Sequence, residues 1–262
     1  YKIYLAGSHT LYQKIKAAYQ DKGLRDFDYH FMSGVYEHDF EVEEATFDTL
    51  PAVKESSVPA GGHLEGNRIG FDAGGSDRKV SAVVDGKTIY SEEVVWFPKT
   101  NEDPKYHYDG IYTAMKTAAE KMGNKIDAIG VSSAGVYIDN KIMVASLFVK
   151  VPKDLFEKHV KYMYIDIAKQ LEKEVGHPIP LEVANDGDVT ALAGAMELKD
   201  TNVLGIAMGT SEAAGYVDSN GNLTGWLNEL AFVPVDFNKD AMVDEWSLDY
   251  GCGVKYFSQD SV

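Results

Sequence analysis

The sequence has few of the features that mark disulfide-rich, membrane-spanning or nucleic-acid-binding proteins. Its single cysteine, Cys252, excludes an internal disulfide framework and any all-cysteine zinc or iron–sulfur site within one chain. No apolar run approaches the roughly 20 residues that span a bilayer, and the start does not resemble a signal peptide. Only 25 lysines and arginines stand against 41 acidic residues, a net charge of −16, which argues against nucleic-acid binding. We expect a soluble, acidic, cytoplasmic protein.

What the sequence does contain is typical of a globular α/β protein. Of its 262 residues, 45% are hydrophobic and 25% charged, which are ordinary values. Residues 1–66 form an acidic, aromatic-rich block, in which we expect extended or irregular structure from Phe27 to Phe47. The hydrophobic pattern over residues 68–198 predicts the order β-β-β-α-β-α-β-α. A strand, glycine turn and strand follow again from residue 202, which predicts a duplicated architecture.

A glycine-rich turn ends the first strand of that pattern, with the sequence Asp72-Ala73-Gly74-Gly75-Ser76. Two glycines let backbone N–H groups approach a phosphate closely. Asp72 could hold magnesium, which favours carboxylate and phosphate oxygens. The alternative is an ordinary hairpin turn, because glycine pairs are common there.

A second turn, Met208-Gly209-Thr210-Ser211, stands at the matching place of the second repeat. It has the same alternative interpretation as a simple turn. Two such turns together are more informative, because a triphosphate held between two domains needs one turn on each.

A third polar segment, Asn185-Asp186-Gly187-Asp188, lies between a predicted strand and a predicted helix. An exposed carboxylate here can accept the proton of a hydroxyl that attacks phosphorus. The alternative is helix capping, for which Asn and Asp are preferred residues.

In their order and spacing, these three segments resemble the ROK family, which comprises sugar kinases and related repressors of the actin/hexokinase superfamily. The resemblance covers roughly residues 68–262. It implies an α/β, actin-like ATPase (ribonuclease H-like) fold of duplicated domains with central mixed β-sheets. Residues 1–66 would then be an N-terminal extension, 67–200 the first domain and 201–262 the start of a second domain, apparently incomplete.

The same resemblance implies an ATP- and magnesium-dependent phosphotransferase that acts on a hydroxyl of a small carbohydrate-like substrate. Asp186 corresponds to the catalytic base of the family, and Asn185 and Glu229 correspond to residues that contact the sugar. Neither nucleic acid nor a membrane is an expected partner, and we allow for a homodimer. The residues implied in binding the phosphates of ATP are Gly74, Gly75, Ser76, Gly209, Thr210 and Ser211.

The sequence departs from the family at its usual zinc site. One histidine and three cysteines bind a structural zinc in typical members, whereas this chain keeps one cysteine, Cys252, with Phe232 near the histidine position. One thiolate cannot build a tetrahedral site, so we predict no structural zinc. We expect packing of Phe232, Tyr250 and Phe257 to replace the metal.

Further departures affect ligand binding. Glu212 follows the second turn, where it either points away, coordinates magnesium or weakens ATP binding through repulsion. Asp77 stands where a lysine often follows the first turn. Leu147 and Phe148 occupy the approximate place of a sugar-binding segment but cannot bond a hexose hydroxyl. The alternative function is therefore a catalytically degenerate ROK-like protein that binds a ligand or regulates a partner.

Overall fold

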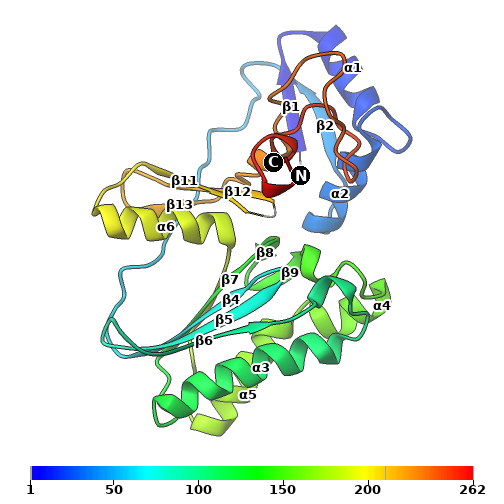
Figure 1. Ribbon diagram of the computed structural model, residues 1–262. Helices are drawn as coiled ribbons and strands as arrows, with labels where there is room; N and C mark the ends of the chain where they lie inside the picture. Colours follow the sequence, from blue (N-terminus) through cyan, green and yellow to red (C-terminus); the bar gives the residue numbers. More distant parts are fainter. Residues whose placement is uncertain (1, 210, 262) are drawn as a thin grey trace. The chain divides into compact units, whose positions relative to one another are not determined.

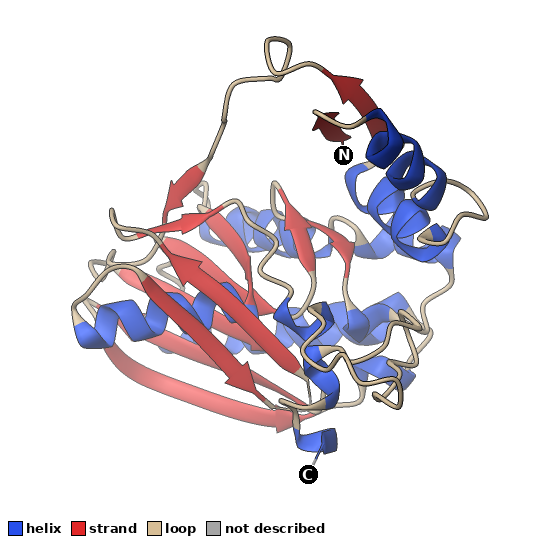
Figure 2. Ribbon diagram, turned by 90° about the horizontal axis from the view of Figure 1, so that it is seen from above, coloured by secondary structure: helices blue, strands red, loops and turns tan. Residues whose placement is uncertain are grey.

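The chain forms two compact units, Tyr1–Ser56 and Ser57–Val262. The computed structural model describes residues 2–209 and 211–261, and for residue 260 the backbone alone. Residues 46–56, which lead from one unit to the other, contain neither a helix nor a strand (Figure 2). No helix within the described residues combines the length and the apolar character needed to cross a membrane.

The first unit consists of two parallel strands and two helices. The prediction of extended or irregular structure from Phe27 to Phe47 is wrong for its first half, which is helical. Phe27 and Phe31, one turn apart, stack with ring centroids 5.7 Å apart, and Asp26 and Asp28 favour the positive N-terminal end. The elements are β1 (Lys2–Ala6), α1 (His9–Ala18), α2 (Asp26–Tyr36) and β2 (Glu41–Ala45).

The second unit is built on a five-stranded mixed sheet in the order β10-β7-β4-β5-β6. Strands β10, β7 and β4 are parallel, and β5 and β6 are antiparallel to their neighbours. Helices α3 and α5 lie along one face (Figure 1), where Ile69, Phe71 and Ile129 are buried against Ile111 and Met115 of α3. The elements are β4 (Asn67–Ala73), β5 (Asp77–Val84), β6 (Lys87–Val95), α3 (Pro104–Lys121), β7 (Ala128–Ser133), α5 (Met163–Val175) and β10 (Leu181–Asn185).

A smaller four-stranded sheet, in the order β11-β12-β13-β3, packs against helix α6. Close contact between helix and sheet requires glycine at two positions. A Cβ on Gly187 would lie 2.3 Å from the carbonyl oxygen of Ala214, and one on Gly215 would lie 2.4 Å from the Cα of Asp188. The elements are β3 (Ser57–Pro59), α6 (Asp186–Leu198), β11 (Val203–Met208), β12 (Glu212–Val217) and β13 (Asn222–Thr224).

Three further features were not predicted from the sequence. A hairpin of β8 (Val136–Ile138) and β9 (Lys141–Val144) follows β7. The helical stretch before α5 is split into α4 (Lys153–Leu155) and a π-helical segment, Phe156–Val160. After β13 the described chain has 3₁₀ turns, Leu230–Phe232, Gly253–Lys255 and Gln259–Ser261, but no long helix. The predicted α/β class, the mixed central sheet and the strand–helix order are nevertheless confirmed, while the domain boundaries after residues 66 and 200 stay predictions.

Candidate active site

The parallel strands β4, β7 and β10 bring two of the polar segments to one edge of the central sheet. Ala73 pairs with Ser133, and Ser133 pairs with Asn185, so the three strands end in one row. Neighbouring strands are about 4.8 Å apart, which places the backbones of Ala73 and Asn185 about 10 Å apart. Asp72 and Asp186 therefore lie at the carboxyl ends of β4 and β10, which are separated by β7.

Asn185 and Asp186 form the start of α6. The Oδ1 of Asn185 accepts a hydrogen bond of 2.8 Å from the N–H of Gly187, and the Oδ1 of Asp186 lies 3.0 Å from the same donor. The Nδ2 of Asn185 also donates to the carbonyl of Gly135 at 2.8 Å. Asn185 therefore caps the helix, as the alternative interpretation held. One amide hydrogen and one lone pair remain for a ligand.

Four carboxyl groups gather around the start of α6. Burial raises the pKa of Asp186, and the negative charge of Asp72 raises it further. Burial likewise raises the pKa of Asp188 to about 6, with the charge of Asp186 adding to the effect. Glu229, just before the turn Leu230–Phe232, has its pKa raised to about 7 by burial and by the charges of Asp186 and Asp188. This cluster can accept protons and hydrogen bonds near neutral pH.

The first glycine turn is fastened to the segment that follows β6. The indole Nε1 of Trp96 donates to the carbonyl of Gly74 at 2.8 Å, and its backbone N–H donates to the carbonyl of Ser76 at 3.0 Å. A Cβ on Gly74 would lie 2.6 Å from the carbonyl oxygen of Asp77, so this position requires glycine. The turn is thus held in one conformation by contacts on both sides.

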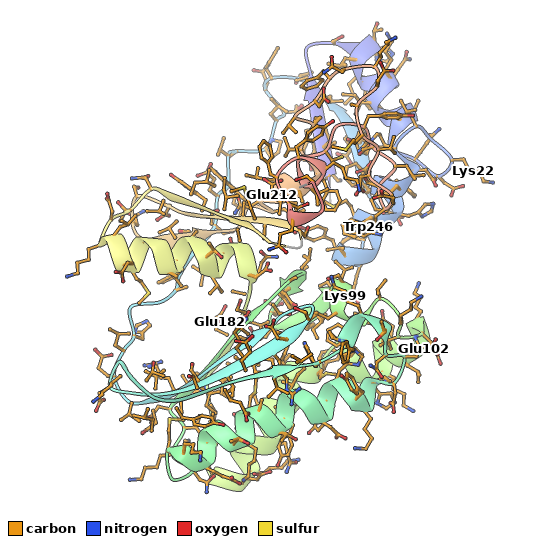
Figure 3. The ribbon with its side chains drawn as sticks, in the orientation of Figure 1. Lys22, Lys99, Glu102, Glu182, Glu212 and Trp246 are labelled. Carbon is orange, nitrogen blue, oxygen red and sulfur yellow. The ribbon has the colours of Figure 1, made fainter. Side chains whose placement is uncertain are left out.

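The second glycine turn joins the antiparallel strands β11 and β12. Gly209 and Ser211 are part of it, whereas Thr210 lies outside the described residues. Glu212 is 7% exposed, and among the described residues its Oε2 has no hydrogen-bond partner. A Cβ on Gly253 would lie 2.5 Å from that oxygen, so the side chain is turned into the C-terminal segment (Figure 3). Of the three alternatives for Glu212, this orientation favours the one in which it points away from the turn.

A cavity of about 600 Å³ lies over the face of the central sheet opposite α3 and α5. Its floor includes Ser81, Ser132 and Glu182, and Leu192 of α6 lies in its wall (Figure 3 labels Glu182). Among the candidate residues within the described ranges, only Asp72 lines it. The cavity therefore meets the carboxylate cluster at Asp72 but does not contain Asp186.

The place of the sugar-binding segment is filled by core residues. Leu147 and Phe148 are 0% and 2% exposed, and the carbonyl of Leu147 lies 3.2 Å from the Nε2 of buried His107. These side chains therefore face the core and not a ligand. Any hydroxyl recognition must come from other positions, of which Asn185, Asp188 and Glu229 are the polar ones near α6.

The expected packing of aromatic residues around Cys252 is only partly right. Phe232 does contact an aromatic ring, but its partner is Trp246, at 5.2 Å between centroids. Tyr250 and Phe257 are 64% and 46% exposed, so they do not form a core. Hydrogen bonds hold this segment as well: the carboxylate of Asp244 accepts the N–H groups of Trp246 and Ser247, and Asp236 accepts the Tyr256 hydroxyl at 2.6 Å. The absence of a structural zinc stays a prediction.

Two residues of the site were missed by sequence reasoning. Asp188 was visible as a second acid in the Asp-Gly-Asp segment, but its perturbed pKa depends on burial, and its long hydrogen bond of 3.5 Å comes from distant Asn228. Lys99 approaches Gly75 from the turn Pro98–Thr100, and no local pattern links the two.

Solved structures with this fold include ROK proteins. No protein-family model and no curated protein matches the chain. A ROK family transcriptional regulator, a homologue of the E. coli MLC protein, matches with a TM-score of 0.53 and 15% identity over 76% of this chain and 48% of its own. ROK hexokinase from Thermus thermophilus matches with a TM-score of 0.51 and 18% identity over 74% of this chain and 61% of its own. Glucokinase from Parabacteroides distasonis matches with a TM-score of 0.50 and 19% identity over 75% and 54%.

The chain thus has the actin-like fold found in ROK sugar kinases and in a ROK regulator, and it spans about half to three fifths of the length of these structures. The resemblance that the three sequence segments indicate is confirmed at the level of the fold. At these identities the fold alone follows, and a kinase and a regulator share it.

Proposed function

We propose that the chain carries the catalytic base and the first phosphate-binding turn of an ATP- and magnesium-dependent kinase of a small carbohydrate-like substrate. The observation that supports this most is the position of Asp186. Asp186 starts a helix at the sheet edge where β4 carries Asp72 next to its last residue and leads into a glycine-rich turn, and the pKa of Asp186 is raised. A base next to a phosphate-binding turn is the arrangement that phosphoryl transfer to a hydroxyl needs.

Asp186 accepts the proton of the attacking hydroxyl in this proposal. A carboxylate of ordinary pKa is a weak base at neutral pH, and burial beside Asp72 makes Asp186 a stronger one. Its side chain is oriented by one contact, because its Oδ1 faces the N–H of Gly187, and its backbone carbonyl accepts the hydroxyl of Thr190 at 2.8 Å. The base is therefore held in place before a substrate arrives.

The residues at the sheet edge fit magnesium and a triphosphate. Asp72 and Asp186 offer carboxylate oxygens, the ligand type that magnesium prefers, and Asp72 is the one we assign to the metal. The backbone N–H groups of the turn Gly74–Ser76 face phosphate oxygens, and those of Gly209 and Ser211 are assigned the same role at the second turn. When bound there, ATP would supply the phosphoryl group, and magnesium would neutralise the charge that develops on it.

The polar groups around α6 suit a substrate with several hydroxyls. Glu229 and Asp188 offer carboxyl oxygens of raised pKa, and Asn185 retains one amide hydrogen and one lone pair. Each of these groups exchanges hydrogen bonds with hydroxyls, which supports a carbohydrate-like molecule as the substrate. We propose Asn185 and Glu229 as the main sugar contacts.

Ligand binding without turnover is the second candidate, and the second turn is the observation that favours it. Glu212 directly follows this turn and is a buried acidic residue whose pKa is raised by burial, with its side chain turned into the C-terminal segment. If its charge reaches the phosphates, nucleotide binding is weakened and the site keeps a sugar without phosphorylating it.

ATP consumption across a panel of hexoses and amino sugars, with and without magnesium, tests the two candidates. The kinase proposal expects consumption that requires both magnesium and one sugar class. Sugar binding in a calorimeter without consumption of ATP would support the binding-only candidate. ATP hydrolysis that does not depend on sugar would contradict both candidates. The Thr190→Ser variant serves as a control, because serine keeps the hydroxyl bond to the backbone carbonyl of Asp186 and should therefore behave nearly as wild type.

A further inference from the structure

Lys99 lies directly against the first glycine turn. A Cβ placed on Gly75 would be 3.0 Å from the Cε and 3.2 Å from the Nζ of Lys99. Lys99 belongs to the 3₁₀ turn Pro98–Thr100 after β6 and is labelled in Figure 3. The end of the lysine side chain thus occupies the space that the missing side chain of Gly75 leaves open. The ammonium group is brought to the turn by tertiary structure alone.

The segment that carries Lys99 is fixed to the turn on one side and to the core on the other. Trp96 makes two hydrogen bonds to the turn, to the carbonyls of Gly74 and Ser76. Pro98 is buried, and its carbonyl lies 3.0 Å from the Nε2 of fully buried His107. A lysine on such an anchored turn loses less conformational entropy on binding than one on a free loop.

The charge of Lys99 is not neutralised by an ion pair within the described residues, in contrast to that of nearby Lys79. Lys79 forms an ion pair of 2.7 Å with Asp77, which lowers the pKa of that carboxyl. The guanidinium of Arg78 lies over the Trp96 ring, 5.8 Å from its centroid. Within the described residues, Lys99 has neither an ion pair nor a side-chain hydrogen bond. A phosphate at Gly75 would meet this ammonium group without displacing an existing partner.

We propose that Lys99 is the cation that binds the phosphate chain of the nucleotide at the first turn. The residue directly after Ser76 cannot serve as this cation, because it is the acidic Asp77. This inference rests on the proposed function, since it names a further binding residue of the same site. Lys99 donates hydrogen bonds to phosphoanhydride oxygens while the backbone N–H groups of Gly74–Ser76 bind from the other side.

Binding of magnesium–ATP and of magnesium tripolyphosphate by titration calorimetry tests the proposal. Tripolyphosphate is a probe without base or ribose, so it reports on the phosphate chain alone. The variants are Lys99→Met, which removes the charge, and Lys99→Arg, which keeps it. Lys87→Met is the matched control, because Lys87 is exposed at the Asp85-Gly86 hairpin, at the opposite end of β5 from the turn.

We expect Lys99→Met to weaken the binding of both probes about 10- to 100-fold, which is the effect of losing a hydrogen bond to a charged group. Lys99→Arg should recover part of this loss, and Lys87→Met should change binding less than about 2-fold. If wild type binds and Lys99→Met binds equally well, Lys99 has no such role and the proposed function is untouched. If wild type binds neither probe, the proposed function fails and this inference with it. An unchanged thermal unfolding midpoint of Lys99→Met separates lost binding from lost folding.

Discussion

The two glycine turns share a backbone design and differ in the charge around them. Each joins a pair of antiparallel strands, the first between Ala73 and Arg78 and the second between Met208 and Glu212. The first turn is bonded to Trp96 and overlain by the ammonium end of Lys99. The ionisable group buried beside the second turn is an acid, Glu212, which is turned into the C-terminal segment.

If both turns bind phosphate as proposed, this difference indicates that they contribute unequally to binding. Backbone N–H groups can bind phosphate oxygens at either turn, and within the described residues a lysine ammonium group, that of Lys99, lies against the first. A buried acid at the second turn is tolerable if it stays away from the ligand, and Gly253 provides the space into which Glu212 turns. The first turn should therefore govern phosphate affinity, and the second should contribute mostly shape.

The largest expected effect comes from the base beside the first turn. Asp186→Asn should lower turnover about 10²- to 10⁴-fold, because the amide cannot take the hydroxyl proton. Asparagine still offers an oxygen to the N–H of Gly187, so the helix start should be kept. Steady-state kinetics with the best sugar measures the change, and nucleotide affinity should stay within about 2-fold of wild type. Unchanged turnover would remove Asp186 as the base.

Alanine at the leading glycine of each turn sharpens the comparison directly. Gly74→Ala should destabilise the protein by about 1–3 kcal/mol, because its Cβ would collide with the Asp77 carbonyl, and it should also weaken ATP binding. Gly209→Ala should change stability by less than about 0.5 kcal/mol, since beyond its chain neighbours the nearest described atom to its Cβ is 4.0 Å away. Chemical denaturation of both variants measures this. Equal losses would show that the two turns are equally constrained.

Glu229 makes the stability of the fold depend on pH. Its folded pKa of about 7 is above its ordinary value of 4.5, so its burial destabilises the fold progressively as pH rises from 4.5 to 7 and fully above 7. After a discount for partial exposure, Glu229→Gln should raise stability by roughly 2 kcal/mol at pH 8. At pH 4.5, wild type and Glu229→Gln should have nearly the same stability. Unfolding curves at the two pH values measure this change in stability. The KM of Glu229→Gln for the sugar should also rise, because Glu229 is a proposed sugar contact. A gain that is the same at both pH values would contradict the assignment.

Glu212 gives the smallest effect. Burial raises its pKa, so its destabilising charge is absent at low pH and present at high pH. Glu212→Gln should therefore raise the thermal midpoint at pH 8 by about 2–4 °C, the shift that roughly 1 kcal/mol produces in a unit of this size. The gain should vanish near pH 4. A gain in ATP affinity of more than 10-fold would contradict the account, because Glu212 would then face the ligand.

The comparison also separates what sequence can predict from what it cannot. Asp72 and Asp186 were predicted because each follows directly from a local pattern, a strand that ends in a polar turn. Lys99 and the orientation of Glu212 were not predictable, because they depend on contacts with Gly75 and Gly253 that are distant in sequence. Tertiary packing also decided the fate of Leu147 and Phe148.

Helix α2 shows the same limit in the first unit. Its sequence begins with alternating acidic and aromatic residues and has few strong helix formers, so composition favours irregular structure. The helix gains from contacts between its own turns, such as the stacking of Phe27 on Phe31, and from the acids at its start. Such contacts cannot be inferred from the sequence unless the segment is already assumed to be helical.

The central proposal is that the protein transfers phosphate to a sugar hydroxyl with Asp186 as the base. Mass spectrometry of the products, after incubation with magnesium–ATP and the sugar panel, tests it most directly. With wild type, one sugar phosphate should form for each ADP, and with Asp186→Asn almost none should form in the same time. Sugar phosphate formed equally by both proteins, or ADP formed without any sugar phosphate, would contradict it.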